Sequence, residues 1–259
     1  MATNIALHTE QPELQSLVEN KSQIYQIPVL NDQLQTDYIL DYASFDAPPG
    51  YLVTLQKTGK QSPGAVMVDF VEGKAAHRRL YGGGRNQPLA RAIGIKAGVN
   101  PTVIDTTAGL GRDSFVMACL GCKVKLLERN PVIYELLNNG IERASYDDSI
   151  GDLVRNNMQL INCDAINYLD HLTAQQIPNT IYLDPMYPLR NKTALVKKEM
   201  RYFHDIAGKD SDAVKLLQKA IDCHPKRVVV KRPKSALPLG ELKPAASIES
   251  KNTRYDIYF

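Results

Sequence analysis

Residues 101–114 read PTVIDTTAGLGRDS, and this stretch decides the fold class. A short apolar run ends in Asp105, small residues follow, and Gly109 and Gly111 precede an apolar segment, FVMACL, of helical length. Glycines let the backbone pass close to a ligand, and the start of the next helix presents unpaired N–H groups there. The order of strand, acid, glycine turn and helix therefore predicts an α/β sheet that builds a nucleotide pocket.

Apolar runs downstream of this turn predict the main architecture. Strands are expected over 123–127, 158–162, 180–183 and 227–230. Helices are expected between them, and the end of the chain has the alternation of an antiparallel pair. This order predicts an α/β fold with a doubly wound, Rossmann-like sheet over residues 76–259.

Residues 1–75 predict a small α+β domain in front of this sheet. A helix is expected over 13–25, with Val18 and Ile24 on its apolar stripe. Strands separated by proline and glycine turns are expected over 38–40, 51–55 and 65–70. No catalytic group of residues stands out here, so substrate docking and cover for the sheet are both open roles.

The composition is that of an ordinary soluble globular protein. The 259 residues are 44% hydrophobic and 23% charged, and no apolar run approaches the roughly 20 residues of a membrane span. The beginning of the chain, MATNIALHTEQ, lacks the basic start and apolar core of a signal peptide, so we expect a cytoplasmic protein without a membrane partner. A net charge of +3 neither requires nor excludes nucleic acid, and the oligomeric state stays open.

The four cysteines raise the question of a metal or redox site. Cys119 and Cys122 have the spacing of half a zinc or redox motif, but no second Cys-x-x-Cys or His pair accompanies them. The pair also straddles the expected helix end at Gly121. We therefore predict buried free thiols and no metal.

Acidic residues follow four of the expected strands. Each strand ends at its own acid: Asp105, Glu128, Asp164 or Asp184. In an open α/β sheet these ends line one crevice, at the point where the strand order reverses. Four acids around one ligand would be costly unless the ligand supplies hydrogen-bond donors, as a ribose diol, an adenine amine and an α-ammonium group do. These features fit either a nicotinamide dinucleotide or S-adenosylmethionine (SAM).

The segment Asp184-Pro185-Met186-Tyr187-Pro188 favours SAM. The lone pair of an exocyclic base amine is delocalised into the ring, so the amine is a poor nucleophile. The carboxylate of Asp184 and the carbonyl held by Pro185 can accept both N–H groups, while Tyr187 can stack on a flipped-out base. Prolines on both sides make the turn rigid, which favours positioning over general-base chemistry. The alternative is a stiff turn with an exposed tyrosine.

Several ordered motifs together resemble one methyltransferase family. They are HRRLYGGGRNQPLARAIG, DTTAGLGRDSFVMACLG, LLERNPVIYELLNNGIERA and IYLDPMYP, and the match covers roughly residues 65–235. They resemble class I SAM-dependent methyltransferases acting on nucleic-acid amines, and more narrowly the ribosomal small subunit methyltransferase J family. The resemblance implies a Rossmann-like class I methyltransferase fold, SAM as cofactor, and methylation of N2 of one guanosine in 16S ribosomal RNA. The implied partner is 16S ribosomal RNA or the small ribosomal subunit.

The same resemblance implies roles for individual residues. The catalytic group would be Asp184, Pro185 and Tyr187, with Asp184 facing both the cofactor and the target amine. The cofactor site would be formed by Asp105, Gly109, Gly111, Arg112, Asp113, Glu128, Arg129, Asp164, Ala165 and Asp184. Within it, Arg112 and Asp113 would lie at the methionine and ribose side. Glu128 would hold the ribose hydroxyls beside Arg129, and Asp164 and Ala165 would sit at the adenine.

Three basic groups near the expected pocket could bind RNA phosphates. They lie at 78–91, with three consecutive glycines at 82–84, at 190–201 and at 226–234. The alternative for the first group is a solvated linker between domains. For the other two it is ordinary solvated side chains on loops.

Three other functions stay open from the residues alone. A dinucleotide-dependent oxidoreductase has nearly the same glycine fingerprint, but Ser114 stands at its third glycine and no hydride-transfer partner is evident. A binding protein with a degenerate methyltransferase fold would be expected to lose Asp184 or the glycine turn. A methyltransferase for another nucleic-acid amine, adenine N6, is the nearest enzymatic alternative.

Overall fold

A small sheet lies near the N-terminus of the chain. The computed structural model describes residues 3–59, 64–73, 77, 84–186, 202, 205–208, 211–240 and 242–259. The small sheet consists of β1 (Ile5–His8), β2 (Tyr38–Ser44) and β3 (Tyr51–Lys57). β2 lies in the middle, parallel to β1 and antiparallel to β3, and the helix α1 (Gln15–Tyr25) stands between β1 and β2 in the chain.

The large sheet has seven strands and the predicted doubly wound topology. The strands are β4 (Thr102–Asp105), β5 (Lys123–Glu128), β6 (Met158–Asn162), β7 (Thr180–Leu183), β8 (Arg227–Pro233), β9 (Ala246–Glu249) and β10 (Thr253–Tyr258). Their order is β6-β5-β4-β7-β8-β10-β9, and β10 runs antiparallel to both of its neighbours. The first five strands of that order are parallel. The order reverses between β4 and β7, which is where an open α/β sheet forms its ligand crevice.

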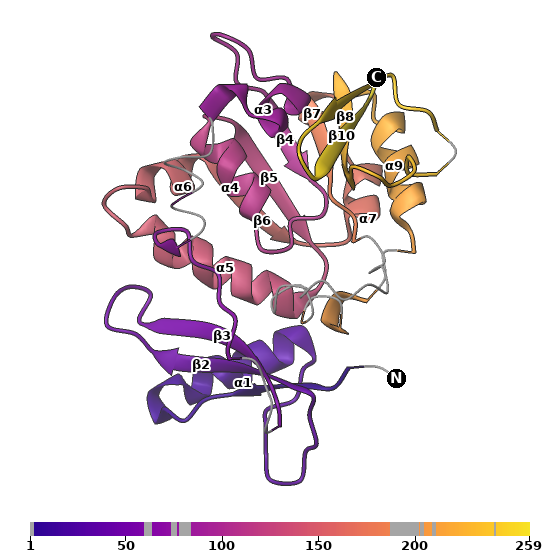
Figure 1. Cartoon of the computed structure of the whole chain (residues 1–259). Helices are drawn as coiled ribbons and strands as arrows, with labels where there is room; N and C mark the ends of the chain where they lie inside the picture. The colour runs from indigo at the N-terminus through magenta and orange to yellow at the C-terminus, as the bar shows by residue number, and fades with distance from the viewer. Residues whose placement is uncertain are drawn as a thin grey trace.

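Helices cover both faces of the large sheet. One core cluster includes residues of α3 (Pro88–Ile93), α4 (Arg112–Cys119), α5 (Pro131–Ser145) and α6 (Gly151–Asn157). The other includes residues of α7 (Ala165–Asp170) and α9 (Ala213–Asp222). Successive strand residues point to opposite faces, so Val103 packs in the first cluster and Ile104 in the second. In Figure 1, α5 runs between the large sheet and the indigo N-terminal part of the molecule.

Local signals in the sequence set the helix boundaries. Asn130 caps α5, because its side chain accepts hydrogen bonds from the N–H groups of Val132 at 3.0 Å and Ile133 at 3.2 Å. A proline follows at the first helical position, where its missing N–H costs nothing. Gly94 ends α3 in the left-handed conformation, with φ of 90°.

Two expectations for the N-terminal part were wrong. Ile24 is 64% exposed, whereas Val18 is fully buried. Val18 and Ile24 are six positions apart, and in an α-helix this spacing places side chains roughly 120° apart. Residues 65–70 form no strand: Val66 makes a single bridge with Leu55. A strand that was not expected, β1, completes the sheet on its other side.

The edge of β3 is occupied by a side chain of α5 instead. Asn139 Oδ1 accepts the N–H of Val53 at 3.1 Å, and its Nδ2 donates to the carbonyl of Tyr51 at 3.1 Å. This amide takes the place of a neighbouring strand, which explains why residues 65–70 pair at one position only. Asn139 itself is fully buried. The contact therefore fixes the small sheet to the helix that flanks the large one.

Both sheets contribute to one hydrophobic core. The larger core cluster contains Leu40 and Leu55 of the small sheet together with Leu126 of the large sheet and Phe115 of α4. Phe70 stacks on Phe115 with ring centroids 4.7 Å apart and so bridges the two parts. The division of the chain at residue 75 stays a prediction.

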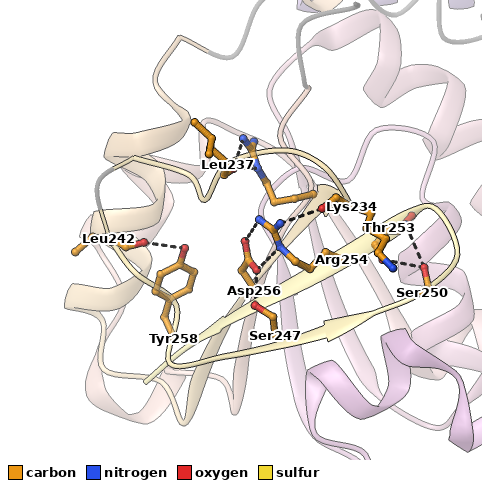
Figure 2. A network of polar contacts seen from close by, with 10 residues as sticks. Lys234, Leu237, Leu242, Ser247, Ser250, Thr253, Arg254, Asp256 and Tyr258 are labelled. Carbon is orange, nitrogen blue, oxygen red and sulfur yellow. Dashed lines mark hydrogen bonds and ion pairs between the residues drawn. The ribbon is translucent and has the colours of Figure 1, made fainter.

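The C-terminal hairpin completes the large sheet through a polar network (Figure 2). Asp256 is fully buried and accepts hydrogen bonds from Arg254 Nε at 2.7 Å and from Ser247 Oγ at 2.7 Å. Arg254 Nη1 also donates to the carbonyl of Lys234, 3.1 Å away. Because a buried carboxylate requires such partners, the network fixes β9 and β10 against the end of β8.

Two kinds of feature are absent from the residues that the structure describes. None of the helices there is long and apolar enough to cross a membrane. No group of three or more His, Cys, Asp or Glu side chains in that part of the chain could hold a metal ion. All four cysteines are free thiols, and of these Cys122 is buried while the others are half-buried.

Replacing Asn139 with leucine is expected to lower the free energy of unfolding by about 2–4 kcal/mol, because a buried N–H and a carbonyl lose their partners. Urea unfolding measures this change in the free energy of unfolding. Asn138→Leu, the same change at the half-buried neighbouring position of α5, is the matched control and should cost less than about 1 kcal/mol. Equal losses in the two variants would contradict the role assigned to Asn139.

Candidate active site

A cavity of about 680 Å³ opens at the carboxyl edge of the parallel strands. Its wall contains Asp105 at the end of β4, Glu128 at the end of β5, Asp164 after β6 and Asp184 after β7. The four acids that were expected to converge therefore share one cavity. The strand order places them there, because β4 and β7 flank the point of reversal.

Most of the residues expected to bind a ligand line this cavity. They are Asp105, Gly109, Arg112, Asp113, Glu128, Arg129, Asp164, Ala165, Asp184 and Pro185. Gly111 is not part of the wall and lies at the N-cap of α4. Tyr187, which was expected to stack on a base, lies outside the described residues. The role of each residue toward a ligand stays a prediction.

Asp105 is the most deeply buried of the four acids, with 2% of its surface exposed. The hydroxyl of Ser114 donates to its Oδ2 at 2.5 Å, and the N–H of Thr107 donates to its Oδ1 at 3.1 Å. Burial raises the pKa of Asp105 to about 7 despite these two hydrogen bonds, and the carboxylates of Asp113 and Asp184 raise it further. This side chain therefore changes its charge near neutral pH.

Glu128 is held by backbone donors. Its Oε2 accepts the N–H of Gly109 at 3.0 Å, and its Oε1 accepts the N–H of Asn130 at 2.8 Å. One carboxylate thus connects the glycine turn with the start of α5. Because each carboxylate oxygen can accept more than one hydrogen bond, ligand hydroxyls can share the same group.

Arg129 connects two sides of the cavity. Its Nη1 lies 2.6 Å from Asp212 Oδ2 and 3.7 Å from Asp164 Oδ2. Asp164 also caps α7, where it accepts the N–H of Asn167 at 3.0 Å. Asp212, the N-cap residue of α9, is a lining residue that the sequence did not single out. The ion pair therefore ties the end of β5 to the start of α9.

Asp184 is held by two neighbours. Its N–H donates to Thr107 Oγ1 at 2.6 Å, and Lys231 Nζ lies 2.7 Å from its Oδ2. The same Nζ lies 2.8 Å from Asp113 Oδ2, which also accepts the hydroxyl of Tyr182 at 2.7 Å. These contacts fix Asp184 to the glycine turn and to the first turn of α4.

Apolar side chains complete the cavity between these polar groups. They are supplied by the glycine turn, by β5, and by α5, α7 and α9: Leu110, Leu127, Ile133, Ile166 and Leu216. A cavity with apolar walls and a few convergent polar groups is typical of a site for a small organic ligand. Apolar surface beside carboxylates suits a flat purine base that carries an amine.

The small N-terminal sheet also reaches toward this cavity. Tyr38 on β2 donates its hydroxyl to Asp205 Oδ2 at 2.5 Å, and Lys57 at the end of β3 lies 3.3 Å from the same oxygen. The next residue, Ile206, accepts a hydrogen bond from Asn130 Nδ2 at 3.2 Å through its carbonyl. Ala207 then lines the cavity. The N-terminal part thus holds one described portion of the cavity wall.

Several residues of the predicted basic groups have partners within the protein. Arg85, Arg227 and Arg232 donate to backbone carbonyls. Lys231 points into the cavity and pairs with carboxylates. Because neighbouring strand residues point to opposite faces, Lys231 and Arg232 do not share one surface, and the role of residues 226–234 toward RNA stays a prediction. Parts of the other two groups, at 78–83 and 190–201, lie outside the described residues.

Four contributors to the site were missed or misread: Thr107, Ser114, Asp212 and Lys231. Ser114 was noted as a departure from a dinucleotide fingerprint, whereas its hydroxyl serves the buried Asp105. Lys231 did carry a signal. It directly follows the apolar run RVVV, just as the acids follow their strands.

Gly109 and Gly111 offer a paired test of the turn. Both have positive φ, 54° and 67°, but a Cβ on Gly111 would lie 2.7 Å from Leu137 Cδ1, whereas nothing lies nearer than 3.9 Å at Gly109. We expect Gly109→Ala to cost about 1–2 kcal/mol of stability, and Gly111→Ala a further 1–3 kcal/mol from overpacking. Urea unfolding measures both, and equal costs would contradict the packing argument.

Known proteins are similar to this chain in sequence and in fold. The family model described as "Putative SAM-dependent methyltransferase" matches residues 34–259. A protein of Aeromonas salmonicida named ribosomal RNA small subunit methyltransferase J is 50% identical over 246 residues, which are 95% of this chain and 97% of that protein. The protein of the same name from Tolumonas auensis is 53% identical over 204 residues, 79% of this chain and 81% of its own length.

A crystal structure agrees with these matches. The SAM-dependent methyltransferase from Neisseria gonorrhoeae is 34% identical to this chain and superposes with a TM-score of 0.73. The match covers 99% of this chain and 95% of that one. The extent and identity of these similarities show that the chain belongs to the ribosomal RNA small subunit methyltransferase J family of SAM-dependent methyltransferases.

Proposed function

We propose that this chain transfers a methyl group from SAM to N2 of a guanosine in 16S ribosomal RNA, free or within the small ribosomal subunit, in the cytoplasm. The observation that carries the proposal is the cavity that Asp184 and Pro185 share with the acids expected to bind the cofactor. Two relatives at 50% and 53% identity are named as ribosomal RNA small subunit methyltransferases, which supports the choice of RNA.

The cavity fits SAM in size and chemistry. Its volume of about 680 Å³ lies within the usual range for small-ligand sites. SAM carries donors at three points, namely its ammonium, ribose and adenine groups, and the cavity offers carboxylates at separate points of its wall. The net positive charge that SAM carries is also favourable among several acids.

We assign these donors to individual side chains. Asp105, with Arg112 and Asp113 nearby, would take the methionine end, and Glu128 beside Arg129 would take the ribose hydroxyls. Asp164 and the backbone at Ala165 would take the adenine, next to the apolar side chains of α5 and α9. The positive φ of Gly109 keeps the backbone of the turn open to the ligand.

SAM, when bound, supplies a methyl group on a positively charged sulfur. The carboxylate of Asp184 and the carbonyl of Pro185 accept the two N–H groups of the guanine amine and turn its lone pair toward that methyl group. The N–CH₃ bond would form as the S–CH₃ bond breaks with its electron pair left on sulfur, and the proton that N2 loses would pass to water. The contribution of the chain is to orient the amine toward the methyl group. Holding two reactants in a reactive geometry raises the rate of their reaction by a large factor.

Asp184→Ala is expected to reduce methyl transfer on the order of 100-fold or more, because the target amine loses its acceptor. The measurement is transfer of tritiated methyl to unmodified small-subunit RNA or subunits, followed by nucleoside analysis. The Kd of SAM, from calorimetry, should change less than about tenfold, since Asp184 is one of several polar contacts. Asp222→Ala, at an exposed position of α9, is the matched control. Label in adenosine, or no label in either RNA substrate with wild type, would contradict the proposal.

The affinity for SAM is expected to fall with acidification through the pKa of Asp105. Below about pH 7 this carboxyl must lose a proton before it can pair with the ammonium group, which costs up to about tenfold in Kd per pH unit. Calorimetry at about pH 6 and pH 7 measures the slope. Asp105→Asn should bind more weakly at neutral pH and show a smaller slope. Equal slopes in the two proteins would contradict the assignment.

A further inference from the structure

We propose that Lys231 is a positioning residue that orients the Asp184 carboxylate toward the target amine by bridging it to Asp113. The proposal rests on the proposed function, because it concerns the same site. The sequence had placed Lys231 in a group of basic residues for RNA phosphates, and the geometry points to this different role.

The register of the sheet brings Lys231 to Asp184. β7 and β8 pair in parallel, and their last pair is Leu183 with Val230. Asp184 and Lys231 directly follow these two residues in the chain. On its other side β8 is paired with β10, where Tyr255 lies opposite Lys231. Lys231 is thus paired with β10, and the residue before it is paired with β7. The C-terminal network of Figure 2 holds β10 in turn, because Asp256 accepts a hydrogen bond from Ser247 of β9 and Arg254 donates one to the carbonyl of Lys234.

One ammonium group bridges two carboxylates. Lys231 Nζ lies 2.7 Å from Asp184 Oδ2 and 2.8 Å from Asp113 Oδ2. Asp113 is nearly buried, with 9% of its side chain exposed, and the hydroxyl of Tyr182 also donates to its Oδ2. Asp113 is therefore a fixed anchor on α4. Through Lys231 it limits how the more exposed Asp184, at 39%, can rotate.

Lys231 keeps its positive charge in this position. Burial lowers its pKa, but attraction to Asp184 and then to Asp113 outweighs burial, so the pKa of Lys231 lies above its ordinary value. A lysine that holds its proton at neutral pH cannot act as a general base. Instead its charge favours the ionised form of Asp184, which is the form that accepts hydrogen bonds from an amine.

The same contacts argue against an RNA-phosphate role for Lys231. Two of its three N–H donors are directed at carboxylates, and 26% of the side chain is exposed. A phosphate contact would require giving up an ion pair inside the cavity. Loss of a phosphate contact weakens RNA binding, whereas loss of a positioning contact slows the chemical step. The two roles therefore predict different kinetic changes.

The test compares Lys231→Met, Lys231→Gln and Lys231→Arg with wild type, using methyl transfer to unmodified small-subunit RNA or subunits over a range of pH. We expect Lys231→Met to lower kcat on the order of 100-fold, with KM for RNA changed less than about threefold. The acid limb of its pH–rate profile should move to higher pH, because the charge that favours ionised Asp184 is gone. Lys231→Arg should restore part of kcat. The kcat of Lys231→Gln, which can still donate a hydrogen bond, should lie between those of Lys231→Met and Lys231→Arg.

Lys219→Met is the matched control, because Lys219 of α9 lies 2.5 Å from Asp170 of α7 in an ion pair, and neither residue lines the cavity. Its kcat should equal that of wild type. Thermal melting and the Kd of SAM for each variant report whether the fold and cofactor site persist, and Lys231→Gln and Lys231→Arg carry the test if Lys231→Met fails to fold. A higher KM for RNA at unchanged kcat, or an unshifted pH profile with unchanged kcat, would overturn the proposal. Inactive wild type would instead overturn the proposed function.

Discussion

Several carboxylates share one cavity, and the free-energy cost of burying like charges together shapes the rest of the site. Each acid has its own compensation. Asp105 has a pKa raised to about 7 and can stay protonated, while Glu128 accepts two backbone N–H groups. Asp164 caps a helix, and Asp184 pairs with Lys231. A cationic ligand with several donors is the natural complement of such an arrangement.

These compensations also connect parts of the chain that are distant in sequence. Thr107 follows β4 and accepts the N–H of Asp184, which follows β7, so the glycine turn and Asp184 are fixed to each other. On the other side, Asn139 of α5 pairs with the edge of β3 and joins the N-terminal sheet to the same framework. Both places are therefore connected by hydrogen bonds to a framework that shares one core.

The sequence predicted the large sheet well because its signals are local. Apolar runs, the cap Asn130 and the glycine turn each lie within a few residues of the element that they define. Residues 65–70 were assigned to a strand because their alternation is correct: Val66, Val68 and Phe70 are buried. Alternation indicates which residues are buried but not which strand they pair with. Here the side chain of Asn139 in α5 already pairs with the edge of β3.

The order of elements along the chain was sufficient to place four acids at one edge of a sheet, because parallel strands always end on the same side. The sequence motifs were likewise sufficient to indicate the family. The partner of each side chain depended on folding. Whether Lys231 meets an RNA phosphate or Asp184 is set by strand register and by which face a residue occupies, and a shift of one residue would reverse it. The two ion pairs of Lys231 join positions 47 and 118 residues apart, and no local pattern encodes them.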